Sequence, residues 1–167
     1  MSAGGLLSKS HAHPMYATGF AIAGIPLNQP IMPEAVIALG EVPIAAYGTP
    51  STMEIPDAVS KYLQNYDAVL LENHGALTYG DSLLGAYHKM ESVEFYAQLL
   101  YISRQLGGPN ELPQDEVRKL CNMRESYGLT GRHPGEAILN KHVESEEVNK
   151  DIIAEITKKV MEQLNLK

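Results

Sequence analysis

Three of the six histidines stand where they could share a single metal ion. His11 and His13 are two residues apart, and side chains at that spacing on an extended strand point to the same face. Pro14 favours extended backbone at His13, because a proline excludes the helical region for the residue before it. His74 follows an apolar segment and precedes Gly75, as at a strand end. Three neutral imidazoles with a fourth position open to substrate form a recognised catalytic zinc site.

Simpler interpretations exist for each histidine. A His-x-His pair near a chain end is also found as an incidental pair or a cloning remnant. His88 lies within an expected helix, and His133 and His142 lie in the C-terminal part of the chain. For these three we expect solvated or packing roles.

The elements that must position the histidines follow from the apolar pattern. Residues 11–47 alternate short apolar stretches with turn residues, which favours short strands and short helical pieces. A helix is expected over residues 51–65, where Ser51 and Glu54 have the spacing of a capping box. Pro56 leaves a later N-cap open, because proline suits only the first turn of a helix. A short buried strand is expected over residues 67–71, immediately before the third histidine.

A long helix is expected after Asp81, which would be its N-cap, and it should stop at Gly107. A shorter helix should run from Gln114 to Glu125. The long helix would bury one apolar stripe with spacings of three and four, made of Leu83, Ala86, Met90, Val93, Ala97 and Leu100.

The C-terminal part reads as an appendage to a domain that spans residues 1–130. A Gly/Pro break and a polar acidic stretch suggest a linker over residues 131–146. Residues 147–167 then predict an amphipathic helix. Its apolar face would consist of Ile152, Ile153, Ile156, Val160 and Leu164.

Composition sets the broad class. The 167 residues are 44% hydrophobic and 20% charged, as in a globular domain, and the net charge of −7 argues against a nucleic-acid surface. A single cysteine, Cys121, cannot form an internal disulfide and suits a reducing compartment. The sequence shows neither a secretion signal nor an apolar run of membrane-spanning length, so we expect a cytoplasmic protein.

Two segments resemble the class II aldolase/adducin family, whose aldolases depend on zinc. The segment from His11 to Gly24 resembles the one that carries its His-x-His pair, and Leu70 to Leu77 resembles its Asn-His-Gly strand end. The segment around Tyr127 resembles the C-terminal part of the fuculose-phosphate aldolase branch, where a tyrosine of the neighbouring subunit donates a proton.

The resemblance implies an α/β (α+β, three-layer) fold, with a central, mostly antiparallel sheet flanked by helices and assembly as a homotetramer. It implies Zn²⁺ on His11, His13 and His74. It also implies retro-aldol cleavage of a phosphorylated ketose, of the L-fuculose 1-phosphate type, to dihydroxyacetone phosphate and an aldehyde. Zn²⁺ would chelate the carbonyl and adjacent hydroxyl oxygens and stabilise the enediolate.

The chain departs from the family pattern before His11. Family members carry a long stretch there, with phosphate-binding loops and a catalytic glutamate, whereas here ten residues precede His11 and none is acidic. We therefore expect an N-terminally truncated domain. Glu34, near the position of a tyrosine in the fuculose-phosphate branch, is a candidate catalytic carboxylate, and Glu72 a candidate support for His74. The alternatives are a surface Glu34, a paired Glu72 and a packing role for Tyr127.

Other functions fit the same resemblance. The family includes L-ribulose-5-phosphate 4-epimerases, which share the fold and the zinc histidines, and adducins, which are non-catalytic interaction modules. The helix expected at 147–167 resembles the encapsulation peptides of enzymes housed in bacterial microcompartments. It could bind a shell protein, or instead pack on its own domain or on sister helices.

Overall fold

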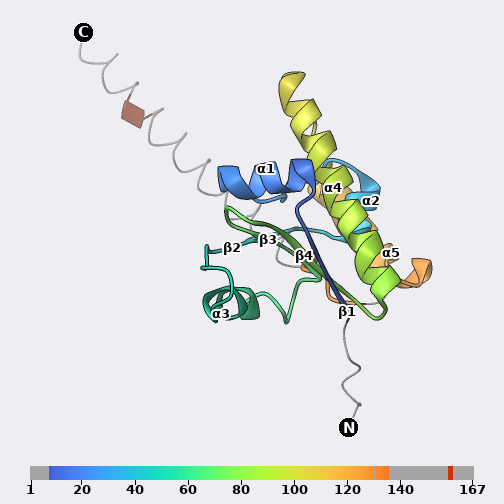
Figure 1. Cartoon of the computed structure of the whole chain (residues 1–167). Helices are drawn as coiled ribbons and strands as arrows, with labels where there is room; N and C mark the ends of the chain where they lie inside the picture. Colours follow the sequence, from blue (N-terminus) through green and yellow to red (C-terminus); the bar gives the residue numbers. More distant parts are fainter. Residues whose placement is uncertain (1–7, 130, 136–157, 160–167) are drawn as a thin grey trace. The chain divides into compact units, whose positions relative to one another are not determined.

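The computed structural model describes residues 8–129, 131–135 and 158–159. The chain divides into two units, Met1–Gly135 and Glu136–Lys167, and the fold described here is that of the first. Figure 1 shows its elements, which the described residues place in the following order. They are β1 (Ser8–Ala12), α1 (Met15–Ala23), α2 (Pro33–Ala38), β2 (Ile44–Ala45), α3 (Glu54–Ser60), β3 (Ala68–Leu71), β4 (Gly75–Gly80), α4 (Leu83–Gln105), α5 (Gln114–Met123) and a short 3₁₀ turn (Glu125–Tyr127).

The strands form one mixed sheet in the order β1-β4-β3-β2. β4 pairs antiparallel with both β1 and β3, whereas β2 pairs parallel with β3. The mostly antiparallel sheet flanked by helices, which the family resemblance implied, is confirmed. The parallel β2 is short because only Ile44 and Ala45 join the ladder, opposite Leu70 and Leu71.

The two faces of the sheet bury different side chains, as the two-residue period of a strand requires. Ala68 and Leu70 of β3 belong to the larger core, which also holds the buried stripe of α4 and the inner face of α1. Val69 and Leu71 face the other way, into a smaller cluster with Val59 of α3. The sheet is thus covered by α1 and α4 on one side and by α3 on the other (Figure 1).

The long helix α4 runs through the predicted stripe. Ala86, Met90, Val93, Ala97 and Leu100 are buried, as expected, whereas Leu83 in the first turn is exposed. The prediction of Asp81 as the N-cap is wrong. The N-cap is Ser82, whose hydroxyl accepts the Gly85 N–H at 3.0 Å.

The predicted capping box at α3 is also wrong. The helix starts at Glu54, with the later N-cap that Pro56 left open, and this N-cap, Met53, offers no side-chain acceptor. The Glu54 carboxylate accepts the N–H of Thr49 at 2.7 Å instead of that of Ser51, and Ser51 takes a left-handed φ of 67°. Pro56 lies in the first turn of the shortened helix, where a proline is tolerated.

The first residues of the expected linker belong to the first unit and make hydrogen bonds within it. The Arg132 N–H donates to the Asp67 carboxylate at 3.0 Å, and the ring of His133 hydrogen-bonds to the Val36 carbonyl at 2.7 Å. The predicted tail helix lies outside the described residues, except for Lys158 and Lys159, which are helical and exposed. Over the described part of the chain, no helix has the length and apolar character needed to cross a membrane.

Candidate metal centre

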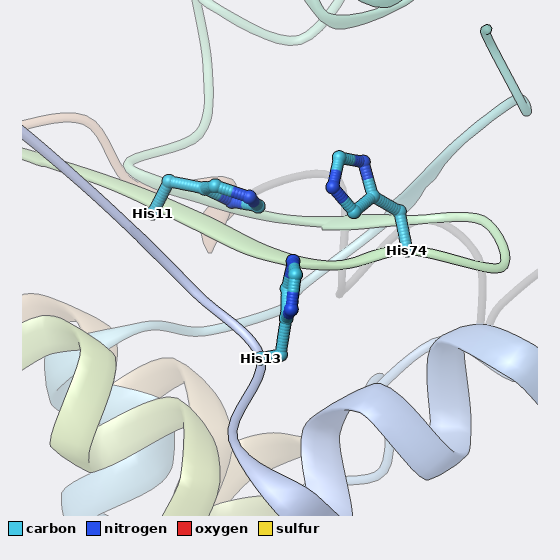
Figure 2. Close-up of side chains that lie close together, drawn as sticks. All are labelled: His11, His13 and His74. Atoms are coloured by element: carbon cyan, nitrogen blue, oxygen red, sulfur yellow. The ribbon is translucent and has the colours of Figure 1, made fainter. Parts of the chain in front are cut away.

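The rings of His11, His13 and His74 converge at one edge of the sheet. Ring centroids lie 5.0 Å apart for His11 and His13, 4.8 Å for His11 and His74, and 5.0 Å for His13 and His74. One nitrogen from each ring lies within 4.8 Å of the others. Figure 2 shows the three side chains pointing toward one another. Liganding nitrogens at such separations can surround one divalent ion.

The register of two strand pairs produces this convergence. His11 lies opposite Leu77, and Ala12 opposite Ala76, in the β1–β4 ladder. The start of β4 therefore meets His13, which follows β1. His74 occupies the tight turn between β3 and β4, so the antiparallel pairing carries it to the same place.

Two backbone features allow the turn to approach so closely. Asn73 adopts a left-handed φ of 54°, which asparagine tolerates better than most residues. Gly75 leaves room for the neighbouring chain, because a Cβ there would lie 2.6 Å from the Ala12 carbonyl oxygen and 2.6 Å from Cδ2 of His13. The backbone of the turn thus explains Asn73, and the close approach of the neighbouring strand explains Gly75.

The hydrogen bonding of His11 and the pKa of His74 favour the binding of a cation. Nδ1 of His11 donates to the Ala76 carbonyl at 2.9 Å, which leaves the Nε2 lone pair available. Burial lowers the pKa of His74, and the charges of His11 and His13 lower it further, so the neutral ligand form is favoured. The buried Nδ1 of His74 has no hydrogen-bond partner in the described part of the chain. The donor set fits a divalent metal.

A pocket of about 360 Å³ adjoins His11 and His74 on the α3 side of the sheet. Lys9 and Tyr79, which are cross-strand partners, supply its polar groups. The remaining lining is apolar and comes from α3, the turn after it and the central strands: Ile55, Pro56, Val59, Leu63, Leu71 and Leu77.

The acid and base residues proposed from the sequence do not line this pocket. Glu34, in the first turn of α2, and Tyr127 line one pocket, and neither lines the pocket of His11 and His74. Glu72, the candidate support for His74, follows the end of β3 at Leu71 and therefore does not share a strand face with His74. The Glu72 carboxylate accepts the Tyr47 N–H at 2.8 Å. In the described residues, the metal-binding group contains no carboxylate.

The role of one carboxylate was not predicted from the sequence. Glu94, in the middle of α4, accepts backbone N–H groups of Tyr16 and Ala17 at the start of α1. The available signal was indirect. A helix that begins after His13-Pro14 has no side chain able to cap it, so its first N–H groups need an acceptor from elsewhere.

The sequence matches the family described as Class II Aldolase and Adducin N-terminal domain over residues 9–101. The chain belongs to this family. The match spans all three histidines, which form a group consistent with the divalent metal site typical of class II aldolases.

Several known proteins are similar to this part of the chain. A 5-deoxy-D-ribulose 1-phosphate aldolase of Bacillus thuringiensis is 34% identical over 119 residues, which is 71% of this chain and 55% of the relative. A 3-oxo-tetronate 4-phosphate decarboxylase of Pectobacterium atrosepticum is 31% identical, over 55% of this chain and 44% of its own. A solved L-fuculose 1-phosphate aldolase superposes with a TM-score of 0.65 at 32% identity, covering 70% of this chain and 55% of that one. The chain therefore spans about half the length of these relatives.

Proposed function

We propose that this chain belongs to a zinc-dependent aldehyde-lyase that cleaves a phosphorylated ketose, of the L-fuculose 1-phosphate type, into dihydroxyacetone phosphate and an aldehyde. The convergence of His11, His13 and His74 carries the proposal. The similar proteins support it, since they include aldolases of fuculose and deoxyribulose phosphates. Three imidazoles with an open fourth position suit a catalytic zinc rather than a structural one.

The chain's own residues would hold and orient the metal. The Ala76 carbonyl fixes the tautomer and orientation of the His11 ring, and burial favours the neutral form of His74. The metal, when bound, supplies Lewis-acid stabilisation for the negative charge that develops on the ketose oxygens as the carbon–carbon bond breaks. The pocket beside His11 and His74 gives the substrate a place to enter, with Lys9 as its cationic group.

Proton transfer would fall to Tyr127 and Glu34. We propose that Tyr127 of a neighbouring subunit, within a homotetramer, donates a proton to the aldehyde oxygen in the aldol direction and accepts that proton from the substrate hydroxyl during cleavage. Tyr127 is 61% exposed on its own chain, which leaves it free to reach another subunit. Glu34 would be the accompanying carboxylate, and the pocket that it shares with Tyr127 supports a joint role.

A decarboxylase is the second candidate. The relative from Pectobacterium atrosepticum is a decarboxylase, and decarboxylation of an oxo-acid phosphate also breaks a carbon–carbon bond beside a carbonyl. Both reactions leave negative charge on the same carbonyl oxygen, so one metal centre can serve either. The products distinguish them, because only the decarboxylase releases carbon dioxide.

We also propose that the C-terminal segment, 147–167, directs the enzyme to a bacterial microcompartment by binding a shell protein. The support is the amphipathic pattern of Ile152, Ile156, Val160 and Leu164 in the sequence. A fluorescent protein fused to residues 140–167 should co-localise with compartments. A diffuse fusion would refute the targeting role.

Product analysis tests the proposed reaction. The chain would be loaded with Zn²⁺ and incubated with L-fuculose 1-phosphate, and dihydroxyacetone phosphate would be followed by a coupled reduction with NADH. His74→Ala should abolish the reaction, and Tyr127→Phe should slow it by about a hundredfold if the tyrosine accepts the proton of the substrate hydroxyl. Carbon dioxide release from 3-oxo-tetronate 4-phosphate, without aldol cleavage, would favour the decarboxylase instead.

A further inference from the structure

The start of α1 is held by a side chain from another helix. Its N-cap, Pro14, has no side-chain acceptor, so the first N–H groups of α1 lack a local partner. The Glu94 carboxylate of α4 supplies both acceptors. Oε1 accepts the Tyr16 N–H at 2.9 Å, and Oε2 accepts the Ala17 N–H at 2.8 Å. Glu94 thus does from a distance what an N-cap side chain does locally.

The two hydrogen bonds are partly shielded from solvent. Glu94 is only partly exposed and Ala17 is fully buried, so solvent competes weakly for these N–H groups. A carboxylate at a helix N-terminus is also favoured by the helix dipole. Further along, the rings of Tyr16 and Tyr101 lie 5.6 Å apart, which ties the same two helices together.

This cap lies next to the metal centre in the sequence. His13 directly precedes Pro14, so the backbone that carries the His13 ring leads straight into the capped turn. On its other side the ring meets Gly75 of β4. His13 is therefore held between the start of β4 and the start of α1, and the Glu94 carboxylate fixes the start of α1.

We propose that Glu94 is a positioning residue for the metal centre, which sets the place of His13 by fixing the N-terminus of α1 on α4. The inference rests on the metal site of the proposed function. The Glu94 carboxylate is occupied by the backbone of α1, so its effect on the metal passes through His13. Removing a group that orients a ligand typically weakens metal binding by about tenfold to a hundredfold.

Titration with Co²⁺, followed by its visible absorption, tests this role. Glu94→Ala should bind Co²⁺ at least about tenfold more weakly than the unmutated chain. Glu94→Gln keeps one acceptor oxygen and should show a smaller loss. Glu91→Gln is the matched control, because Glu91 lies one turn earlier on the same helix, contacts Tyr87 and His88, and should leave the affinity unchanged.

A second control separates positioning from general stability. Val117→Ala in α5 removes a fully buried side chain and should lower the unfolding free energy without changing Co²⁺ affinity. Relative to the other protected amides, hydrogen exchange at Tyr16 and Ala17 should accelerate in the Glu94 variants and not in Val117→Ala. Equal Co²⁺ affinity for Glu94→Ala and the unmutated chain would overturn the inference while leaving the metal site intact. A failure of the unmutated chain to bind Co²⁺ would overturn the metal site, and the inference with it.

Discussion

Gly75 begins β4 in direct contact with the chain that carries His13, and replacing it by alanine should disturb the metal centre. A Cβ at this position would lie 2.6 Å from the Ala12 carbonyl oxygen and 2.6 Å from Cδ2 of His13. Each of these two distances would have to be nearly an ångström longer for an ordinary van der Waals contact. Ala12 is paired with Ala76 in the ladder, so its backbone cannot easily retreat. The His13 ring must then move, or the two strands must separate.

The expected cost of Gly75→Ala is that of overpacking a close contact, about 1–3 kcal/mol of unfolding free energy. Metal binding should weaken further, because zinc sites tolerate displacements of only about 0.2 Å in their ligands. We expect a loss of Zn²⁺ affinity of about tenfold or more. Denaturant unfolding and competition with a chromophoric chelator measure the two effects separately.

Gly19→Ala is the matched control. Gly19 lies inside α1, and an added Cβ there meets no atom within 4 Å. The replacement should stabilise the chain by about 0.5–1 kcal/mol, since alanine is favoured over glycine within a helix. Its Zn²⁺ affinity should stay unchanged. If Gly75→Ala matched the unmutated chain in both stability and Zn²⁺ affinity, the steric explanation for this glycine would be refuted.

Two further predictions concern a buried histidine and the turn before His74. Burial lowers the pKa of His133 to about 4, with a smaller contribution from Arg124, while the Val36 carbonyl and Asp67 act in the opposite direction. The unfolded chain takes up this proton below about pH 6.5 and the folded chain only near pH 4, so His133 stabilises the fold above pH 6.5 and progressively less below it. The unfolding free energy should fall by up to about 2 kcal/mol between pH 7.5 and pH 5 through His133 alone, and a His133→Gln variant with the same pH dependence would contradict this. Asn73→Ala should lower the unfolding free energy by about 1 kcal/mol and weaken Zn²⁺ binding, because alanine disfavours the φ of 54°. Asn73→Gly should have neither effect, because glycine adopts this φ readily. Equal stability of the two variants would refute the role of this turn.

Local signals indicated each of the three histidines, and the family resemblance joined them into one group, which the structure brings together. The two-residue spacing of His11 and His13 needed only an extended backbone, and Pro14 favours that backbone. The buried strand of residues 68–71 and the glycine after His74 indicated a strand end. The apolar stripe of α4 indicated a long helix in the same way, by its period alone.

Features that depend on tertiary contacts could not be predicted from the sequence. Glu54 had the spacing of a capping box, yet its carboxylate bonds to Thr49 because the chain before α3 turns back toward it. Glu94 looked like one more polar residue on a helix, and its function depends on where α1 begins. The parallel pairing of β2 with β3 likewise follows from how the chain returns to the sheet after α2, which no local pattern specifies.

Zinc content tests the central claim most directly. The chain would be purified without a histidine tag, alongside His74→Ala, and zinc per chain would be measured after extensive dialysis. We predict about one zinc per unmutated chain and close to none in the variant, because two imidazoles hold Zn²⁺ far more weakly than three. An unmutated chain without zinc, or a variant that keeps it, would contradict a metal centre formed by His11, His13 and His74.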